Sequence, residues 1–137
     1  MSKRYLVDTS VLARAVQREI GDRLEHLALH GNLWTCRMVD LELGFASRAN
    51  AVPKALHARR LLPEAPITPA VMDRSLEVME LLAGAGQHRG AKPADLIIAA
   101  AAELSGLTVL HYDDDYDRIA AATGQQCEWI TTRGSID

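Results

Sequence analysis

The sequence predicts an α/β domain with a short central parallel sheet flanked by helices. Short apolar runs suited to buried strands alternate along the chain with longer segments of helical periodicity, an order typical of parallel sheets. One helical segment, residues 94–105, is apolar on nearly every side, as expected of a helix buried in a layered fold. A length of 137 residues fits one domain, and we expect it to span residues 1–137.

The periodicity places four strands and seven helices in alternation. Strands are expected at residues 5–7, 33–35, 108–110 and 128–130. Helices are expected at 10–18, 23–30, 37–47, 55–62, from 68 to the loop at 84–92, at 94–105 and at 116–122. Ser10 and Thr68 are the expected N-caps, and Gly106 follows the end of its helix as a C′ residue.

Composition and charge narrow the function classes. The formal net charge is −3, so the chain has no global positive field, and nucleic acid binding requires a local basic patch. No apolar run reaches the roughly 18 residues of a membrane span, and the first strand begins too early for a targeting segment. We therefore expect a cytoplasmic protein that does not bind membranes.

Acidic residues fall at two strand ends and on two helices of this small domain. Asp8 follows the first strand, Asp113 follows the third, and Glu42 and Asp95 lie on helices. Each alone also fits a structural role, as a helix cap, a first-turn carboxylate or a solvated loop residue. Together they predict an oxygen-only site for Mg²⁺ or Mn²⁺, because no Cys or His lies at a spacing that favours zinc.

Four sequence stretches resemble the PIN domain, and more closely the VapC-type ribonuclease toxins of toxin–antitoxin pairs. They are VDTSVL at the N-terminus, LELGFA with Glu42, ADLIIAAAA with Asp95 and VLHYDDDYDRIA with Asp113, and they occur in the order of that family. The resemblance implies a single PIN domain and a metal-dependent endoribonuclease in which a metal-activated water cleaves RNA and leaves a 5′-phosphate. It also implies a VapB-type antitoxin as partner and a homodimer within a larger toxin–antitoxin complex.

Carried over by residue, the resemblance assigns the following roles. The catalytic residues are Asp8, Glu42, Asp95 and Asp113, and the metal ligands are Asp8, Asp95, Asp113 and Asp115. The run of three aspartates leaves the choice among residues 113, 114 and 115, and the number of ions, open. Residues near the motifs that suit contact with the RNA substrate are Ser10, Arg14, Arg89 and Lys92.

Two other interpretations fit parts of the pattern. One is a PIN-like module without catalysis that binds RNA or acts as a scaffold. The other is a phosphatase-like domain with Asp8 as nucleophile, although that chemistry usually needs an Asp where this chain has Ser10. The five histidines form no evident pair in the sequence, and we expect them mostly on the surface or in loops.

Overall fold

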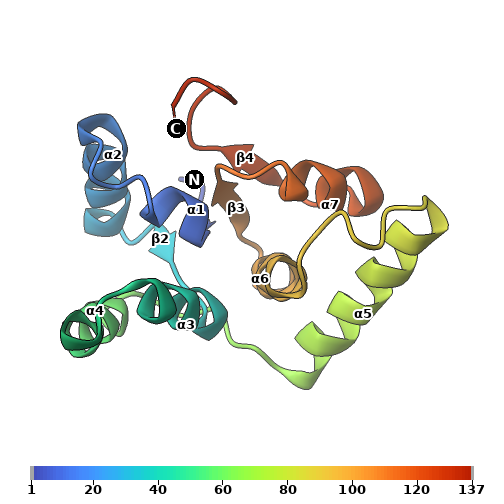
Figure 1. The fold of residues 1–137 in the computed structure, drawn as a ribbon, viewed down its shortest axis with the longest axis horizontal. Coiled ribbons are helices and arrows are strands. Elements are labelled where there is room, and N and C mark those ends of the chain that lie inside the picture. The colour runs from blue at the N-terminus through green and yellow to red at the C-terminus, as the bar shows by residue number, and fades with distance from the viewer. Residues whose placement is uncertain (1, 137) are drawn as a thin grey trace.

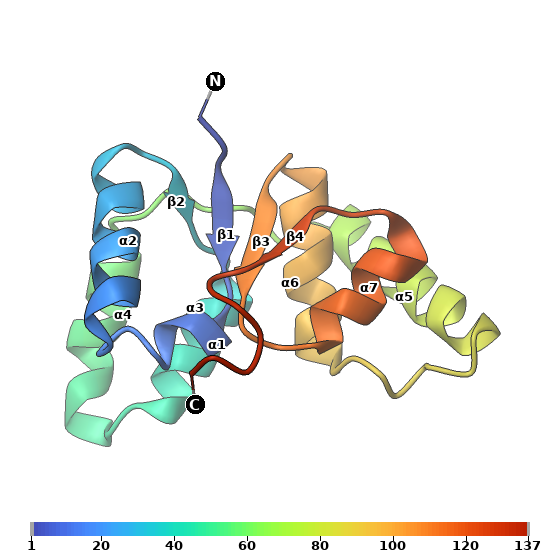
Figure 2. The same ribbon diagram turned by 90° about the horizontal axis from the view of Figure 1, so that it is seen from above.

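A four-stranded parallel sheet lies at the centre of the computed structural model, which describes residues 2–136. The strands are β1 (Tyr5–Val7), β2 (Leu33–Trp34), β3 (Thr108–His111) and β4 (Cys127–Trp129). Their order across the sheet is β2-β1-β3-β4, and Figure 2 shows them side by side. Every neighbouring pair is parallel, which confirms the α/β fold class.

Helices occupy most of the chain between the strands (Figure 1). They are α1 (Thr9–Leu12), α2 (Arg18–Leu29), α3 (Arg37–Ala46), α4 (Val52–Arg59), α5 (Pro69–Gly84), α6 (Pro93–Leu104) and α7 (Asp115–Thr123), with a short 3₁₀ turn at Ala49–Ala51. The N-cap predicted for α5 is confirmed, because the Thr68 side chain accepts a hydrogen bond from the backbone N–H of Val71.

The two faces of the sheet contribute to two separate hydrophobic clusters. Leu6 and Val109 pack with residues of α3, α5, α6 and α7. Tyr5, Val7 and Leu110 point the other way and pack with α1, α2 and the segment after β4. This alternation follows from the two-residue period of a strand, and it makes a three-layer fold with the sheet in the middle. The apolar helix α6 is buried, as predicted.

The helix predicted at residues 10–18 is wrong in its extent and its cap. Asp8, not Ser10, is the N-cap, because its carboxylate accepts a hydrogen bond from the backbone N–H of Ser10. Helix α1 ends at Leu12, and the chain continues in tight turns with Val16 exposed to solvent. Helix α2 begins at Arg18, five residues before the expected start. Its Gly21 passes so close to the Ala15 carbonyl that a Cβ would lie 2.7 Å from that oxygen.

Two expectations about the histidines are corrected. His111 belongs to β3 and is fully buried, where a surface or loop position was expected. His26 and His30 form a pair on α2 with ring centroids 4.3 Å apart, because residues four apart share one helix face. That pair lies at the end of α2 that leads into β2, so it sits by the amino edge of the sheet, away from the site described below.

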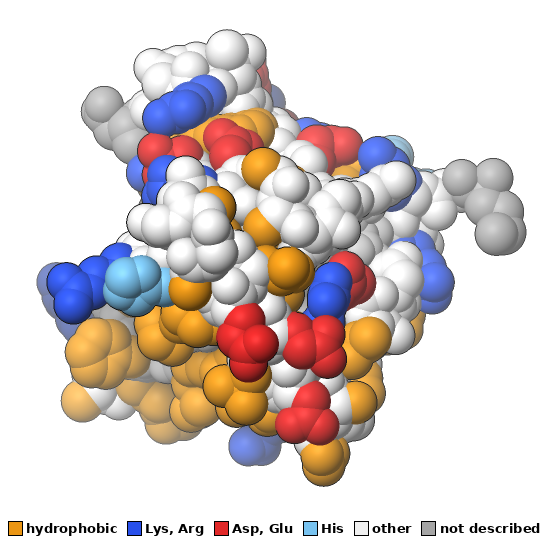
Figure 3. All heavy atoms as spheres, turned by 90° about the vertical axis from the view of Figure 1, so that its right-hand side faces the viewer, with side chains coloured by type: hydrophobic (Ala, Val, Ile, Leu, Met, Phe, Trp, Pro, Cys, Tyr) orange, Lys and Arg blue, Asp and Glu red, His pale blue; other side chains and the backbone are white. Residues whose placement is uncertain are grey.

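Several hydrophobic side chains face outward. In the α3 stripe of Met38, Leu41 and Phe45, only Met38 packs against the core: Leu41 is 64% exposed and Phe45 is 94% exposed. Helix α5 also exposes Met72, Leu76 and Leu81. Figure 3 views the side of the molecule on which α5 lies and shows hydrophobic side chains intermixed with acidic ones.

Helix α4 begins and ends three residues earlier than expected. Within residues 2–136, no helix has the length and hydropathy needed to cross a membrane.

Candidate active site

Three carboxylates meet beyond the carboxyl edge of the sheet. Asp95 lies in the first turn of α6, Asp113 in the loop after β3, and Asp115 at the start of α7. Each offers one oxygen, and the three oxygens lie within 4.8 Å of one another. Asp95 is only 3% exposed, so this acidic cluster of Asp95, Asp113 and Asp115 reaches from the protein interior to the surface.

Asp8 joins this cluster through a buried tyrosine. The phenol of Tyr116 donates a 2.6 Å hydrogen bond to Asp8 Oδ1, and the Tyr116 hydroxyl oxygen also lies 3.5 Å from Asp95 Oδ1. Burial raises the pKa of Tyr116 well above its ordinary value, and the charges of Asp8 and Asp95 raise it further, so the phenol keeps its proton for Asp8. Sequence reasoning missed Tyr116. The available signal was a tyrosine among aspartates, because a buried phenol needs a polar partner.

Glu42 lies on α3 at the margin of the site. Its Oε1 accepts a 2.8 Å hydrogen bond from the hydroxyl of Thr9, the residue after Asp8. Glu42 is not a member of the three-carboxylate cluster, but its negative charge is close enough to raise the pKa of Tyr116. The structure therefore brings all four predicted acidic positions to one edge of the sheet, with Glu42 outside the three-carboxylate cluster.

Lys92, the N-cap of α6, reaches into the acidic cluster. Its Nζ lies 3.4 Å from Asp95 Oδ2, 3.4 Å from Asp113 Oδ2 and 3.0 Å from Asp115 Oδ2. Arg118 adds a second cation, with Nη2 2.7 Å from Asp115 Oδ1. Asp114 instead pairs with Arg118 and with Arg133, so it faces away from the cluster. Among the three consecutive aspartates, Asp113 and Asp115 are the two that converge with Asp95.

The pKa values of Asp95 and Asp115 are shifted in opposite directions. Burial raises the pKa of Asp95 to about 8, helped by its hydrogen bond with Asp115 and the charge of Asp8. Burial also acts to raise the pKa of Asp115, but hydrogen bonds with Asp95, Lys92 and Arg118 outweigh it and hold the pKa at about 2. Asp95 therefore retains a proton near neutral pH while Asp115 is ionised.

This arrangement fits a divalent cation. Asp95 Oδ2 is buried and has no hydrogen-bond donor among residues 2–136, only the Lys92 ammonium at 3.4 Å. An oxygen-only donor set of this kind suits a hard cation, which would coordinate the oxygen that lacks a donor and offset both the burial and the carboxylate repulsion that keep Asp95 protonated.

The four residues predicted to contact substrate have different surroundings. Ser10 Oγ accepts a hydrogen bond from the backbone N–H of Tyr112, which ties α1 to the end of β3. Arg14 donates to the Ser10 carbonyl, and its guanidinium lies 4.5 Å from the centroid of the Tyr112 ring. Lys92 lies in the acidic cluster, as described. Arg89 is exposed on the turn between α5 and α6, and among the described residues no ion pair connects it to the cluster.

Comparisons with known proteins agree on one family. The sequence pattern of the PIN domain matches residues 5–122. Ribonuclease VapC51 of Mycobacterium tuberculosis is 42% identical over 141 residues, covering 100% of both chains. Ribonuclease VapC21 from the same species is also 42% identical, covering 98% of this chain and 99% of its own.

Solved structures show the same fold at lower identity. The DNA-bound VapBC structure from Salmonella typhimurium superposes with a TM-score of 0.74 at 18% identity, over 95% of this chain and 100% of that chain. The VapBC-5 structure from Mycobacterium tuberculosis gives a TM-score of 0.62 at 22% identity, over 96% and 100% of the two chains.

Proposed function

Because the chain belongs to the PIN domain family, and within it to the VapC ribonucleases, we propose that it is a metal-dependent endoribonuclease. We propose that it serves as the toxin of a VapBC-type toxin–antitoxin pair. The observation that carries the proposal is the acidic cluster, in which Asp95 lies beside Asp113 and Asp115 and has a buried oxygen without a hydrogen-bond donor among residues 2–136. We further propose that it acts in the cytoplasm as one domain over residues 1–137.

The proposed cofactor is Mg²⁺ or Mn²⁺, held by Asp95, Asp113 and Asp115 with Asp8 alongside. When bound, a divalent cation activates water as the nucleophile and neutralises negative charge on the phosphodiester. Asp8 is locked in place by Tyr116 and by the backbone of Ser10, so its carboxylate is held rigidly at the end of β1. Rigid ligands favour one coordination geometry, which supports the assignment of Asp8 to this site.

Glu42 is the proposed proton acceptor. Thr9 engages Oε1, which orients the carboxylate and leaves Oε2 to take a proton from the attacking water. The proposed products are a 5′-phosphate and a 3′-hydroxyl. A cyclic phosphate mechanism usually needs histidine as acid and base, and His111 is buried, with a pKa lowered by that burial.

Substrate contacts are proposed for the residues around the cluster. Lys92 contacts the carboxylates and Arg14 lies against Ser10 and Tyr112 at the edge of the site, so both suit RNA phosphates, whereas Arg89 suits a more distant phosphate. The hydroxyl of Ser10 accepts a bond from Tyr112 and still has its own proton to donate.

The proposed antitoxin site is an apolar groove between α3 and α4. Its volume is about 490 Å³, and it is lined by Met38, Leu41, Glu42, Gly44, Phe45, Val52 and Leu56. The large exposed fractions of Leu41 and Phe45 favour cover by the apolar face of a partner helix. Because Glu42 lines this groove, an occupant would lie beside the active site. A homodimer within the larger complex is also proposed.

The decisive experiment is cleavage of total cellular RNA with sequencing of the new ends. Wild type and Asp95→Asn are compared in Mg²⁺, Mn²⁺ and EDTA, with Asp73→Asn as control, because Asp73 is an exposed aspartate on α5. We expect discrete cuts with 5′-phosphates that EDTA and Asp95→Asn abolish and that Asp73→Asn leaves intact. Equal behaviour of all three proteins would instead favour a non-catalytic RNA-binding module. A covalent phosphate trapped on Asp8 would favour the phosphatase-like alternative.

A further inference from the structure

We propose that a pocket beside Asp113 binds one nucleotide of the RNA, with the base against the indole of Trp129 and a phosphate against Arg14 or Arg133. This inference rests on the proposed ribonuclease function and deepens it, because it assigns the position at which the enzyme holds a base next to the cleaved bond.

The pocket adjoins the acidic cluster directly. It has a volume of about 370 Å³ and is lined by Arg14, Tyr112, Asp113, Asp114, Trp129, Arg133, Gly134 and Ile136. Asp113 belongs both to this lining and to the three-carboxylate cluster. A group bound in the pocket therefore lies next to the cluster where the phosphodiester is proposed to react.

Two aromatic rings form a rigid corner of the pocket. The centroids of Tyr112 and Trp129 lie 5.3 Å apart, and the ring planes are at 85° to each other. The indole N–H of Trp129 donates to Asp117 Oδ1 at 3.0 Å, and the buried ring of His111 packs edge-on at 5.0 Å. Aromatic faces bind bases by stacking without regard to sequence, so an indole held in a fixed orientation is a suitable platform.

A guanidinium lies over each ring. Arg14 lies 4.5 Å from the Tyr112 centroid and Arg133 lies 5.7 Å from the Trp129 centroid. Arg133 is 64% exposed and is held by an ion pair with Asp114, a contact that costs little to break at the surface. An incoming base can therefore take its place over the indole, while the displaced guanidinium is available to a phosphate.

The segment at residues 131–136 closes one side of the pocket. Tyr112 donates its phenol proton to the Ile136 carbonyl at 2.7 Å and accepts a bond from the Ile136 N–H at 3.1 Å. These two bonds fix the segment that carries Arg133 and Gly134 over the aromatic corner.

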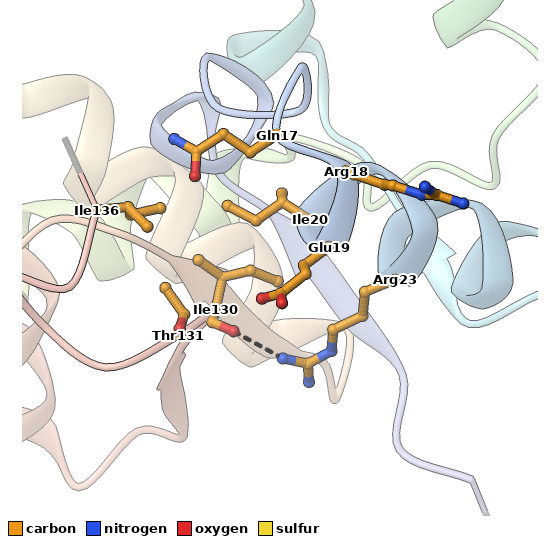
Figure 4. Close-up of a pocket in the computed structure, with 8 residues that line it drawn as sticks. All are labelled: Gln17, Arg18, Glu19, Ile20, Arg23, Ile130, Thr131 and Ile136. Atoms are coloured by element: carbon orange, nitrogen blue, oxygen red, sulfur yellow. Dashed lines mark hydrogen bonds between the residues drawn. The ribbon is translucent and has the colours of Figure 1, made fainter.

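A second pocket provides a comparison from the same protein (Figure 4). It measures about 350 Å³, lies between α2 and the segment after β4, and contains the two cations Arg18 and Arg23. Its lining has no aromatic ring and none of the clustered carboxylates, and Arg23 is bound to the Ile130 carbonyl. Size and positive charge alone therefore do not distinguish the proposed site, whereas the aromatic corner and Asp113 do.

The first test uses the fluorescence of Trp129 in EDTA, where binding is separated from metal-dependent cleavage. The protein has two tryptophans, so Trp34→Phe leaves Trp129 as the only indole. Titration with a short single-stranded RNA is expected to quench the Trp129 emission in a saturable way. Inorganic phosphate alone is expected to cause no quenching. Arg133→Gln is expected to weaken the RNA affinity about tenfold, within the range for loss of one stacking or ionic contact. Arg18→Gln, in the comparison pocket, is expected to leave it unchanged.

The second test is the KM for RNA cleavage in Mg²⁺. We expect Trp129→Leu and Arg133→Gln to raise KM with little change in kcat, and Trp129→Phe to retain most of the affinity. Circular dichroism shows whether Trp129→Leu is folded. If that variant is unfolded, the KM of Arg133→Gln alone tests the pocket. RNA cleavage with no quenching and unchanged KM in Arg133→Gln would overturn the pocket and leave the proposed function intact. Quenching without cleavage would support the pocket and overturn the nuclease. Neither quenching nor cleavage would overturn both.

Discussion

The Nζ atom of Lys92 lies 3.0 Å from Asp115 Oδ2, and the same ammonium is within 3.4 Å of Asp95 and Asp113. A lysine from the N-cap of α6 therefore serves as counterion to the carboxylates proposed to hold a metal. A divalent cation bound by these carboxylates would compete with Lys92 for the same negative charge, because either cation relieves the repulsion among them.

Replacing this lysine tests the competition. In EDTA we expect Lys92→Gln to lower the Tm, because the carboxylates then repel one another without compensation. The same variant is expected to bind Mn²⁺ about two- to fivefold more tightly in calorimetry, a change of about the size of one exposed ion pair. Lys54→Gln, an exposed lysine on α4, is the control. Weaker Mn²⁺ binding in Lys92→Gln would mean that the lysine supports the metal site.

The raised pKa of Asp95 makes stability depend on pH. Folding raises this pKa from an ordinary value of 3.8 to about 8, so the folded protein holds a proton that the unfolded chain releases. The contribution of that proton to stability is present below about pH 4 and is lost as the pH rises through about 8. Asp115, with its lowered pKa, acts in the opposite direction only below about pH 4.

Thermal unfolding between pH 5 and 9 measures this effect. In EDTA we expect the Tm of wild type to fall as the pH rises, and Asp95→Asn to flatten the dependence because its amide does not titrate. Millimolar Mg²⁺ is expected to raise the wild-type Tm most at the alkaline end. Parallel curves for the two proteins in EDTA would contradict the assignment of the proton to Asp95.

Removing the phenol of Tyr116 isolates its role in holding Asp8. We expect Tyr116→Phe to lower the free energy of unfolding by about 1–3 kcal/mol, because Asp8 is buried and loses a hydrogen-bond donor. The kcat for RNA cleavage is expected to fall while KM stays the same, because the Tyr116 hydroxyl is not among the groups proposed to contact RNA. Urea denaturation and steady-state kinetics measure the two effects.

Tyr5→Phe is the matched control for this variant. Tyr5 also donates its phenol proton to a carboxylate, Glu128, but that bond is only partly buried and lies outside the active site. We expect a smaller loss of stability and no change in kcat. Equal kinetic effects of the two substitutions would show that Tyr116 acts only through the stability of the fold.

Phe45 tests the antitoxin groove separately from catalysis. Because its side chain is 94% exposed, Phe45→Ser is expected to change the stability of the isolated protein by less than about 0.5 kcal/mol. RNA cleavage should persist, whereas co-purification with a co-expressed antitoxin and inhibition by it should be lost. Leu29→Ser, an exposed leucine on α2, should retain both. Normal inhibition of Phe45→Ser would place the antitoxin elsewhere.

The layered α/β fold and the place of the acidic site were predictable from local patterns. Apolar runs mark the strands, the apolar helix α6 marks the interior, and residues after parallel strands such as Asp8 and Asp113 must meet at one sheet edge. Helix limits were less predictable. The apolar residues around Val16 suggested a continuing helix, but α1 ends at Leu12 and the chain turns so that Val16 is exposed.

The sequence by itself determined the fold class and the acidic residues that follow the strands or lie on the helices, because periodicity and strand ends are local properties. Only the tertiary structure decided which partners those residues have. Tyr116 binds Asp8, Lys92 pairs with the acidic cluster, and Arg59 lies buried against Asp40 and Thr35. Each of these contacts joins residues 19 to 108 positions apart, and their geometry depends on how the layers pack.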